Sequence, residues 1–336
     1  VVVMKHFEMG QGTYTGLSTL IAEELDADWD QIQVKAAPAN AKLYNNNFWG
    51  PMQGTGGSTA IANSYEQMRK AGAAAKQMLV AAAAKQWKVP AEEIQVENGV
   101  LSHKASNKSA NFGEFAELAA RETVPQEVFL KSSDEFRFIG KSVPRKDSHD
   151  KTTGKAIYTQ DIKLPGMLTA LVAHAPRIGA SVKSFDATAC KKVKGVINVV
   201  QIPTGIAVLA KDYWSALQGR YALKVDWDES QAFKKGSAEL MGEYKALAKK
   251  PGSVARKDGD VDTAMASAVK TLSASYEFPY LAHAAMEPLN CVVQIKKEVC
   301  EIWNAAQTQT SDQMAVAKVL GIEVDQVKIN TLYAGG

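Results

Sequence analysis

The sequence predicts an α+β fold, and three observations carry this prediction. Two segments with helical periodicity, Thr13–Leu25 and Thr59–Trp87, stand beside short β-type runs in the first half of the chain. From Lys155 onward, short strand-like and short helical segments alternate, which is typical of a small separate α/β unit. A stretch at 231–262, rich in Lys, Gly and Ser, is typical of a linker with one helix, and a strand-rich section follows it. With 336 residues, the chain is long enough for two or three such packed units.

In the first half, apolar spacing and glycine punctuation define the predicted elements. Leu17 and Leu20 recur at helical spacing, and Ser58 is a suitable N-cap for the long helix. Asn98-Gly99 favours a type I′ hairpin turn. The predicted strands are Val1–Phe7, Ile32–Ala36, Ile94–Glu97 and Val100–His103, and the predicted helices are Thr13–Leu25, Thr59–Trp87 and Phe112–Ala120.

In the second half, short β-type runs dominate. The predicted strands are Leu168–Ala173, Val196–Ile202, Ala207–Ala210, Leu223–Trp227, Thr271–Phe278, Asn290–Ile295, Val299–Trp303 and Val327–Leu332. The predicted helices are Ala187–Val193, Tyr213–Tyr221, Ser237–Lys249 and Ser311–Leu320.

Composition excludes several classes of protein. The formal net charge is +3, from 39 basic and 36 acidic side chains, which is too balanced for a nucleic-acid surface. No apolar run approaches the roughly 20 residues of a membrane-spanning helix. Three cysteines are too few for a disulfide scaffold. A β-type start at Val1 and a glycine turn at the end indicate a piece of a longer polypeptide.

Glycine-rich turns that lead into helices are the strongest local signal. Gly10-Gln11-Gly12 precedes one predicted helix, and Gly54-Thr55-Gly56-Gly57-Ser58 precedes the longest one. Such turns present backbone N–H groups at the positive end of a helix dipole, which suits a phosphate or pyrophosphate. Either turn alone would favour a tight strand-to-helix connection that binds nothing. Together with Gly335-Gly336, they favour a large phosphorylated cofactor.

Other catalytic and binding motifs do not fit. Thr15 stands where a dinucleotide-binding fingerprint needs its third glycine, and Glu135 stands where a P-loop needs its first. His283 and Glu287 lack a second histidine for a zinc site, so no metal-ligating residue is predicted, and all five histidines are expected to be structural or solvated. Phe48 and Trp49 fit either a core or a pocket wall.

Four motifs resemble the xanthine oxidase family of molybdenum hydroxylases. They are Glu8-Met9-Gly10-Gln11-Gly12, Gln53 to Thr59, Met286-Glu287-Pro288, and Trp303 through Gln307-Thr308-Gln309. The likeness is to the large, molybdopterin-binding subunit, and within it to the isoquinoline 1-oxidoreductase beta-subunit type. It covers essentially the whole chain.

The resemblance implies an order of domains. Residues 1–133 would be a partial molybdopterin-binding domain, and 134–230 an α/β hammerhead domain. Residues 231–262 would be the linker with its helix, and 263–336 the first part of the principal molybdopterin-binding domain. An export leader before Val1 and a second cofactor-binding half after Gly336 are expected.

The resemblance also implies a reaction, its cofactors and its site residues. The reaction is hydroxylation of an aldehyde or N-heterocycle with water-derived oxygen, and its electrons pass to 2Fe-2S clusters on a small iron–sulfur subunit. The cofactor is molybdopterin with molybdenum, or its cytosine dinucleotide form. The location implied by the resemblance is the periplasm, and the alternative is the cytoplasm. Gln307 would face the molybdenum, while the general base would lie beyond Gly336. The implied cofactor-binding residues are Gln11, Gly12, Gly54, Thr55, Gly56, Gly57, Ser58, Gly335 and Gly336.

Two alternatives stay open at this point. The chain could be a cofactor-free fragment or interaction module without catalytic activity. A nucleotide-binding dehydrogenase is a weaker alternative, because the glycine spacings do not match its fingerprint.

Overall fold

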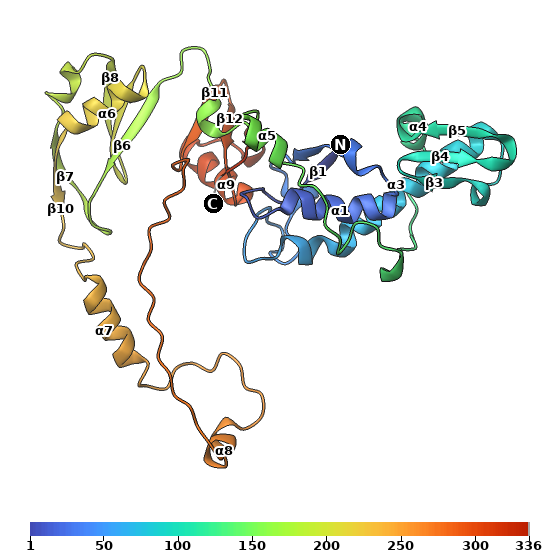
Figure 1. Ribbon diagram of the computed structural model, residues 1–336. Helices are drawn as coiled ribbons and strands as arrows, with labels where there is room; N and C mark the ends of the chain where they lie inside the picture. Colours follow the sequence, from blue (N-terminus) through green and yellow to red (C-terminus); the bar gives the residue numbers. More distant parts are fainter. Residues whose placement is uncertain (335–336) are drawn as a thin grey trace. The chain divides into compact units, whose positions relative to one another are not determined.

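Helices and small β-sheets make up residues 1–334, the part of the chain that this computed structural model describes (Figure 1). This mixture confirms the predicted α+β class. The chain divides into two units. The first contains residues 1–162 and the described residues from 284 onward, and the second contains residues 163–283. The second unit is therefore an insertion in the sequence of the first.

The first unit contains three small sheets. Strands β1 and β2 pair in parallel, β3, β4 and β5 form an antiparallel sheet, and β12 pairs antiparallel with β11 and parallel with β13. The strands are β1 (Val2–Met4), β2 (Val34–Ala36), β3 (Gln95–Glu97), β4 (Val100–His103), β5 (Lys108–Asn111), β11 (Cys291–Lys296), β12 (Val299–Asn304) and β13 (Val327–Thr331). The helices are α1 (Thr13–Leu25), α2 (Ala41–Tyr44), α3 (Ala60–Trp87), α4 (Phe112–Ala119), α5 (Ser148–Thr153) and α9 (Gln309–Leu320).

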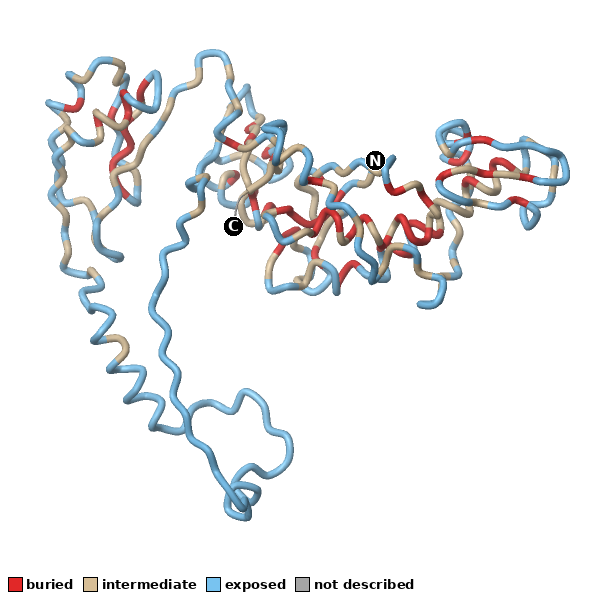
Figure 2. The backbone as a smooth tube through the Cα atoms, viewed as in Figure 1, coloured by how far each residue is buried: buried red, intermediate tan, exposed pale blue. Residues whose placement is uncertain are grey.

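Each sheet packs against a helix and closes its own apolar core. Leu17 and Leu20 of α1 are buried with Met4 of β1 and Met68 of α3. The C-terminal half of α3 packs on α4 and the β3–β5 sheet, and α9 packs on β12 and β13. Figure 2 shows these buried segments in red. The turn between β3 and β4 is confirmed as type I′, since Asn98 and Gly99 both have positive φ (49° and 77°).

Helices α1 and α3 run in the same direction and touch along their length. Gly16 lies against Ile61 near their starts, and Gly72 lies against Ile21 and Glu24 near the end of α1. Because the pairing is parallel, the N-termini of the two helices lie at the same end of the pair. This brings both glycine-rich turns to one place.

We expect Gly72→Ala to destabilise the first unit, because the helices meet there without room for a side chain. A Cβ at position 72 would lie 2.6 Å from the backbone oxygen of Ile21. Separating two packed helices to relieve such overpacking costs about 1–3 kcal/mol. Urea unfolding measures this loss. Gly113→Ala is the control, since nothing lies within 4 Å of its Cβ position, and equal stability of both variants would contradict the prediction.

Buried carboxylates of α1 hold the segment after residue 130. Glu23 accepts the backbone N–H groups of Arg137, Phe138 and Ile139 at 2.7–3.1 Å. Glu24 accepts from Nε of Arg69 at 2.7 Å and from the backbone N–H of Lys131 at 3.1 Å, and it forms an ion pair with Nη2 of Arg69 at 2.6 Å. The segment at residues 131–139 is therefore fixed to α1.

The second unit has a three-stranded antiparallel sheet, β6-β9-β8, and an antiparallel pair, β7 and β10. Its core contains Cys190, Val199, Ile206 and Val208. Its elements are β6 (Thr169–His174), β7 (Ser181–Asp186), β8 (Val196–Ile202), β9 (Gly205–Ala210), α6 (Tyr213–Ala222), β10 (Lys224–Asp228), α7 (Ser237–Leu247) and α8 (Val261–Ala266). Residues 242–284 are exposed throughout (Figure 2).

Three predicted local features are wrong. Thr271–Phe278 forms no strand, because no segment among residues 1–334 pairs with it. Ala187–Val193 contains only a 3-10 turn, Cys190–Lys192. Ser58 is not the N-cap of α3; it has a left-handed backbone (φ 56°), and Thr59 takes the N-cap position.

The predicted domain boundaries at 134 and 231 stay a prediction. The structure separates its two units after Ile162 and after His283.

Candidate cofactor-binding site

Three segments that are distant in sequence meet in the first unit. Gln11 Nε2 donates to the carbonyl of Phe7 at 2.8 Å, and the Phe7 N–H donates to Oγ1 of Thr55 at 2.8 Å. The Thr55 N–H donates to the carbonyl of Gln307 at 2.8 Å, and Gln307 Nε2 donates back to the carbonyl of Thr55 at 3.1 Å. The structure thus brings together Gln11, Thr55 and Gln307, which the sequence predicts as site residues.

The N-termini of α1, α3 and α9 converge at this point. Their starts at residues 13, 60 and 309 directly follow the segments that the hydrogen bonds join. The start of α9 is fastened to the glycine-rich loop because Gln53 N–H donates to Oγ1 of Thr310 at 2.9 Å. Converging positive helix ends favour an anionic ligand, unless a carboxylate of the chain already occupies them.

Such a carboxylate occupies the first glycine turn. Glu8 is fully buried, and its Oε1 accepts the N–H groups of Gly10 at 2.8 Å and Gly12 at 3.1 Å. Its Oε2 accepts the N–H of Tyr14 at 2.9 Å, and Nη2 of Arg145 lies 3.4 Å from Oε1. Glu8 therefore takes the place that a ligand's anionic group would take at the start of α1. The Gly12 amide donates to Glu8, and the Gln11 side chain hydrogen-bonds the backbone of Phe7 and Met9.

The second glycine turn has no such internal anion. Among residues 1–334, the amide groups of Gly56, Gly57 and Ser58 have no hydrogen-bond acceptor. The N-cap Thr59 makes no side-chain cap bond, and the first turn of α3 has no acidic residue. Gly57 and Ser58 are exposed and both have positive φ (59° and 56°). Their amides lie at the uncapped positive end of a 28-residue helix.

Trp49 explains why this turn needs glycine. A Cβ at Gly54 would lie 2.6 Å from Cζ3 of Trp49, and one at Gly56 would lie 3.1 Å from its Cη2. The indole therefore packs directly against the backbone of the turn and supports it from one side. Trp49 therefore lies beside the candidate site, and the interpretation of this residue as a pocket wall stays a prediction.

The Gln307 amide has a fixed orientation. Its nitrogen must face the Thr55 carbonyl, because a carbonyl oxygen only accepts. The side chain is exposed, so Oε1 and the second N–H of Gln307 remain for a neighbour. A neutral amide can thus contact a polar group without adding charge.

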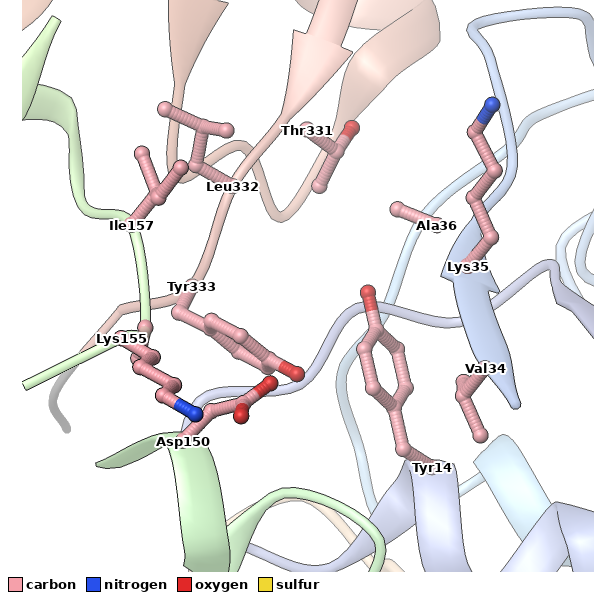
Figure 3. Close-up of a pocket in the computed structure, with 11 residues that line it drawn as sticks. Tyr14, Val34, Lys35, Ala36, Asp150, Lys155, Ile157, Thr331, Leu332 and Tyr333 are labelled. Atoms are coloured by element: carbon pink, nitrogen blue, oxygen red, sulfur yellow. The ribbon is translucent and has the colours of Figure 1, made fainter. Parts of the chain in front are cut away.

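A hollow of about 290 Å³ lies beside α1 and the end of β13 (Figure 3). The rings of Tyr14 and Tyr333 approach each other there with centroids 5.8 Å apart. Burial, and then nearby acidic groups including Asp147 and Asp150, raises the pKa of Tyr333 to about 12, so its hydroxyl stays protonated. None of the predicted site residues within 1–334 lines the hollow. The predicted Gly335 and Gly336 follow Tyr333 closely but lie outside the described residues.

Sequence reasoning missed the roles of Glu8 and His6. Glu8 precedes the first turn by two residues, and this proximity is the signal that could have identified it as an internal anion. His6 is buried behind Thr55 and contacts Asn63 of α3. In residues 1–334, no group of three or more His, Cys, Asp or Glu side chains could hold a metal ion. None of the helices described in that range is long and apolar enough to cross a membrane.

Comparison with known proteins decides the family. Molybdopterin cofactor-binding domain families match residues 1–165 and residues 247–336. The beta subunit of isoquinoline 1-oxidoreductase from Brevundimonas diminuta is 31% identical over 381 residues, which cover 100% of this chain and 48% of that protein. The chain belongs to the xanthine oxidase family.

Two further relatives of this chain have names that state different substrates. A membrane-bound aldehyde dehydrogenase (pyrroloquinoline-quinone) of Gluconacetobacter polyoxogenes is 30% identical, with 98% of this chain and 44% of that protein covered. A nicotinate dehydrogenase subunit of Pseudomonas putida is 28% identical, with 98% and 28% covered. The chain spans less than half the length of each of these three relatives.

The site fits the phosphate-bearing cofactor that gives the matched domains their name. Unpaired amides at an uncapped helix start bind phosphate well, and Gly56, Gly57 and Ser58 supply them. The family resemblance alone gives both glycine turns a share in cofactor binding. The structure divides them, since the Gly12 amide serves Glu8 and the second turn keeps its donors free.

Proposed function

We propose that this chain holds a molybdopterin cofactor at the start of α3, as part of an oxidoreductase that hydroxylates an aldehyde or an N-heterocycle. One observation carries the proposal. The second glycine turn, Gly54 to Ser58, contains no internal carboxylate, and it lies at the uncapped start of α3 beside Gln307. The printed names of the relatives support the reaction class, since they include isoquinoline, aldehyde and nicotinate oxidoreductases.

The residues of the chain have separate tasks in this proposal. Gly56, Gly57 and Ser58 donate backbone N–H groups to the cofactor phosphate. Trp49 supports the turn, and Thr55 fixes the amide of Gln307 toward the site. The bound cofactor supplies the molybdenum centre at which the substrate is oxidised.

Further parts of the proposal rest on the family resemblance. They are a small subunit with 2Fe-2S clusters as electron acceptor, oxygen drawn from water, and the cytosine dinucleotide form of the pterin. The hammerhead assignment of 134–230, a general base beyond Gly336 and a periplasmic location belong to the same group.

We expect Ser58→Asp to lower cofactor occupancy of the purified protein about tenfold. A carboxylate beside the free amides would compete for them as Glu8 does in the first turn, and charge at a helix terminus contributes up to about 2 kcal/mol. Molybdenum by elemental analysis and pterin released by oxidation measure the occupancy. Asn107→Asp is the matched control, because Asn107 is also exposed and left-handed (φ 52°) but lies in the turn before β5.

Two outcomes would overturn the proposal. Wild-type protein that carries neither molybdenum nor pterin would favour a cofactor-free interaction module. Full occupancy in Ser58→Asp would place the phosphate away from the start of α3.

A further inference from the structure

His6 lies behind the second glycine turn with only 1% of its surface exposed. Its Nε2 is 3.0 Å from Nδ2 of Asn63, on α3. Its Nδ1 is 3.4 Å from Oγ1 of Thr55, and the ring also hydrogen-bonds the backbone of Gly54. One buried ring therefore touches both the helix that follows the turn and the residues that begin it.

The Asn63 amide holds the other side of the ring. Asn63 Nδ2 donates to the carbonyl of Thr59 at 2.6 Å, which fixes the amide on α3. His6 Nε2 lies 3.0 Å from Nδ2 and 3.3 Å from Oδ1 of this amide, so Nε2 can hydrogen-bond Asn63 in either tautomer. The Nδ1 side of the ring faces Thr55 and Gly54.

The surroundings keep this ring neutral. Burial lowers the pKa of His6, and the positive charge of the adjacent Lys5 lowers it further, against the opposing hydrogen bonds to Asn63 and Gly54. Lys5 is itself buried, with its Nζ 2.7 Å from Oε1 of Gln67, and burial lowers its pKa to about 8. Protonating His6 would place a second cation beside Lys5 without a carboxylate partner.

Thr55 links His6 to Gln307. The Thr55 hydroxyl accepts the Phe7 N–H at 2.8 Å and lies against the His6 ring, while its backbone bonds Gln307 in both directions. A change at the ring therefore displaces Thr55, and with it both the turn and the orientation of Gln307.

We propose that His6 is a positioning residue for the second glycine turn and for Gln307. It acts through Gly54 and Thr55 and does not itself meet the ligand. The identity of the ligand rests on the proposed function, whereas the positioning is a property of the chain alone. His6 lies outside the four motifs that carry the family resemblance, and the sequence alone predicts a structural or solvated histidine there.

Two conservative variants separate positioning from simple filling of space. His6→Asn keeps an amide N–H near the place of Nδ1, and His6→Gln keeps a polar group near the place of Nε2. His6→Phe keeps the bulk and loses both. We expect hydrogen exchange of the Thr55 amide to rise about tenfold in His6→Gln and His6→Phe, the effect of losing one buried hydrogen bond, and to change much less in His6→Asn.

The measurement uses purified protein with the cofactor removed, and the buried Leu101 amide of β4 is the internal reference. Equal protection in His6→Asn and His6→Gln, or unchanged protection in His6→Phe, would overturn the proposal. If the variants fail to fold, nitrogen NMR of the wild-type ring decides: a pKa at or above the ordinary value of 6.5 would overturn it.

Cofactor content distinguishes this inference from the proposed function. Molybdenum and pterin content should fall in His6→Gln and His6→Phe together with turn protection. If hydrogen exchange of the Thr55 amide follows the expected order in a protein that never carries molybdenum or pterin, the role of His6 is supported and the proposed function is refuted. If the wild type carries the cofactor and the exchange is unchanged in every variant, the proposed function is supported and the role of His6 is refuted.

Discussion

Glu8→Ala is expected to lower the free energy of unfolding of the first unit by about 3 kcal/mol. The substitution leaves the amides of Gly10, Gly12 and Tyr14 without their acceptor and removes one carboxylate from Arg145. Hydrogen bonds to a charged group contribute about 1.5–3 kcal/mol each, and breaking a buried ion pair costs about 3–5 kcal/mol. Arg145 is partly exposed and keeps Asp147, so the lower end of that range applies. Urea unfolding gives the value.

Rescue by a small anion makes this prediction specific. Glu8→Ala leaves a carboxylate-sized space lined by three amides, and we expect formate or acetate to raise the Tm of the variant and not that of the wild type. Glu114→Ala is the matched control, because Glu114 also accepts a backbone N–H, that of Asn111, at a helix start but is exposed. Failure of both anions to stabilise Glu8→Ala would show that Glu8 is not an internal substitute for a bound anion.

Glu23→Ala is the second large effect, and we expect a loss of about 3 kcal/mol together with release of the segment after residue 130. Five hydrogen bonds converge on Glu23, from the amides of residues 137–139 and from Nζ of Lys131. A buried set of donors without its acceptor carries the full cost of desolvation. Limited proteolysis should cut the variant near Arg137 while the wild type resists.

The same carboxylate predicts a dependence on pH. Burial alone would raise the pKa of Glu23, but the amide donors of Arg137, Phe138 and Ile139, with Lys131, lower it below the ordinary 4.5. The unfolded chain therefore binds the proton more readily. The contribution of Glu23 to stability is present above about pH 4.5 and is lost as the pH falls through the lowered pKa of the folded state.

Comparing wild type with Glu23→Gln across this range isolates the effect. The difference in free energy of unfolding between wild type and Glu23→Gln should shrink as the pH falls below about 4.5. Glu66→Gln serves as control, since Glu66 is an exposed partner of Lys70 on α3, and its replacement should leave stability almost unchanged. A difference that stays constant down to pH 3 would contradict the role assigned to Glu23.

Local signals in the sequence predicted the bounds of α1, whereas the failed strand depended on a distant partner, for a physical reason. Periodic leucines and flanking glycines are local signals, and α1 begins and ends where they predict, at Thr13 and Leu25. A strand needs a partner that is distant in sequence. Thr271–Phe278 alternates apolar and polar residues but has no partner among residues 1–334, so the pattern did not produce a strand.

For the candidate site, the sequence indicated the segments, but it did not indicate which of the two glycine turns the Glu8 side chain occupies. Hydrogen bonds join Gln11 to Thr55 through Phe7, and Thr55 to Gln307, while the role of these residues in binding stays a prediction. Which glycine turn is free depends on where the Glu8 side chain folds, and composition and spacing do not specify this. The contacts of His6 depend in the same way on α3 lying parallel to α1, which brings Asn63 next to it.

The insertion of residues 163–283 has a consequence for synthesis. A nascent chain that has emerged as far as residue 162 contains both glycine turns, Glu8 and Trp49, but lacks Gln307, the partner of the Thr55 backbone. The first turn can close at once, because all its contacts up to Arg145 are present. The second turn gains its contact with Gln307 only after the whole second unit has left the ribosome. If the start of α3 binds the cofactor as proposed, loading is coupled to synthesis of the chain well beyond it.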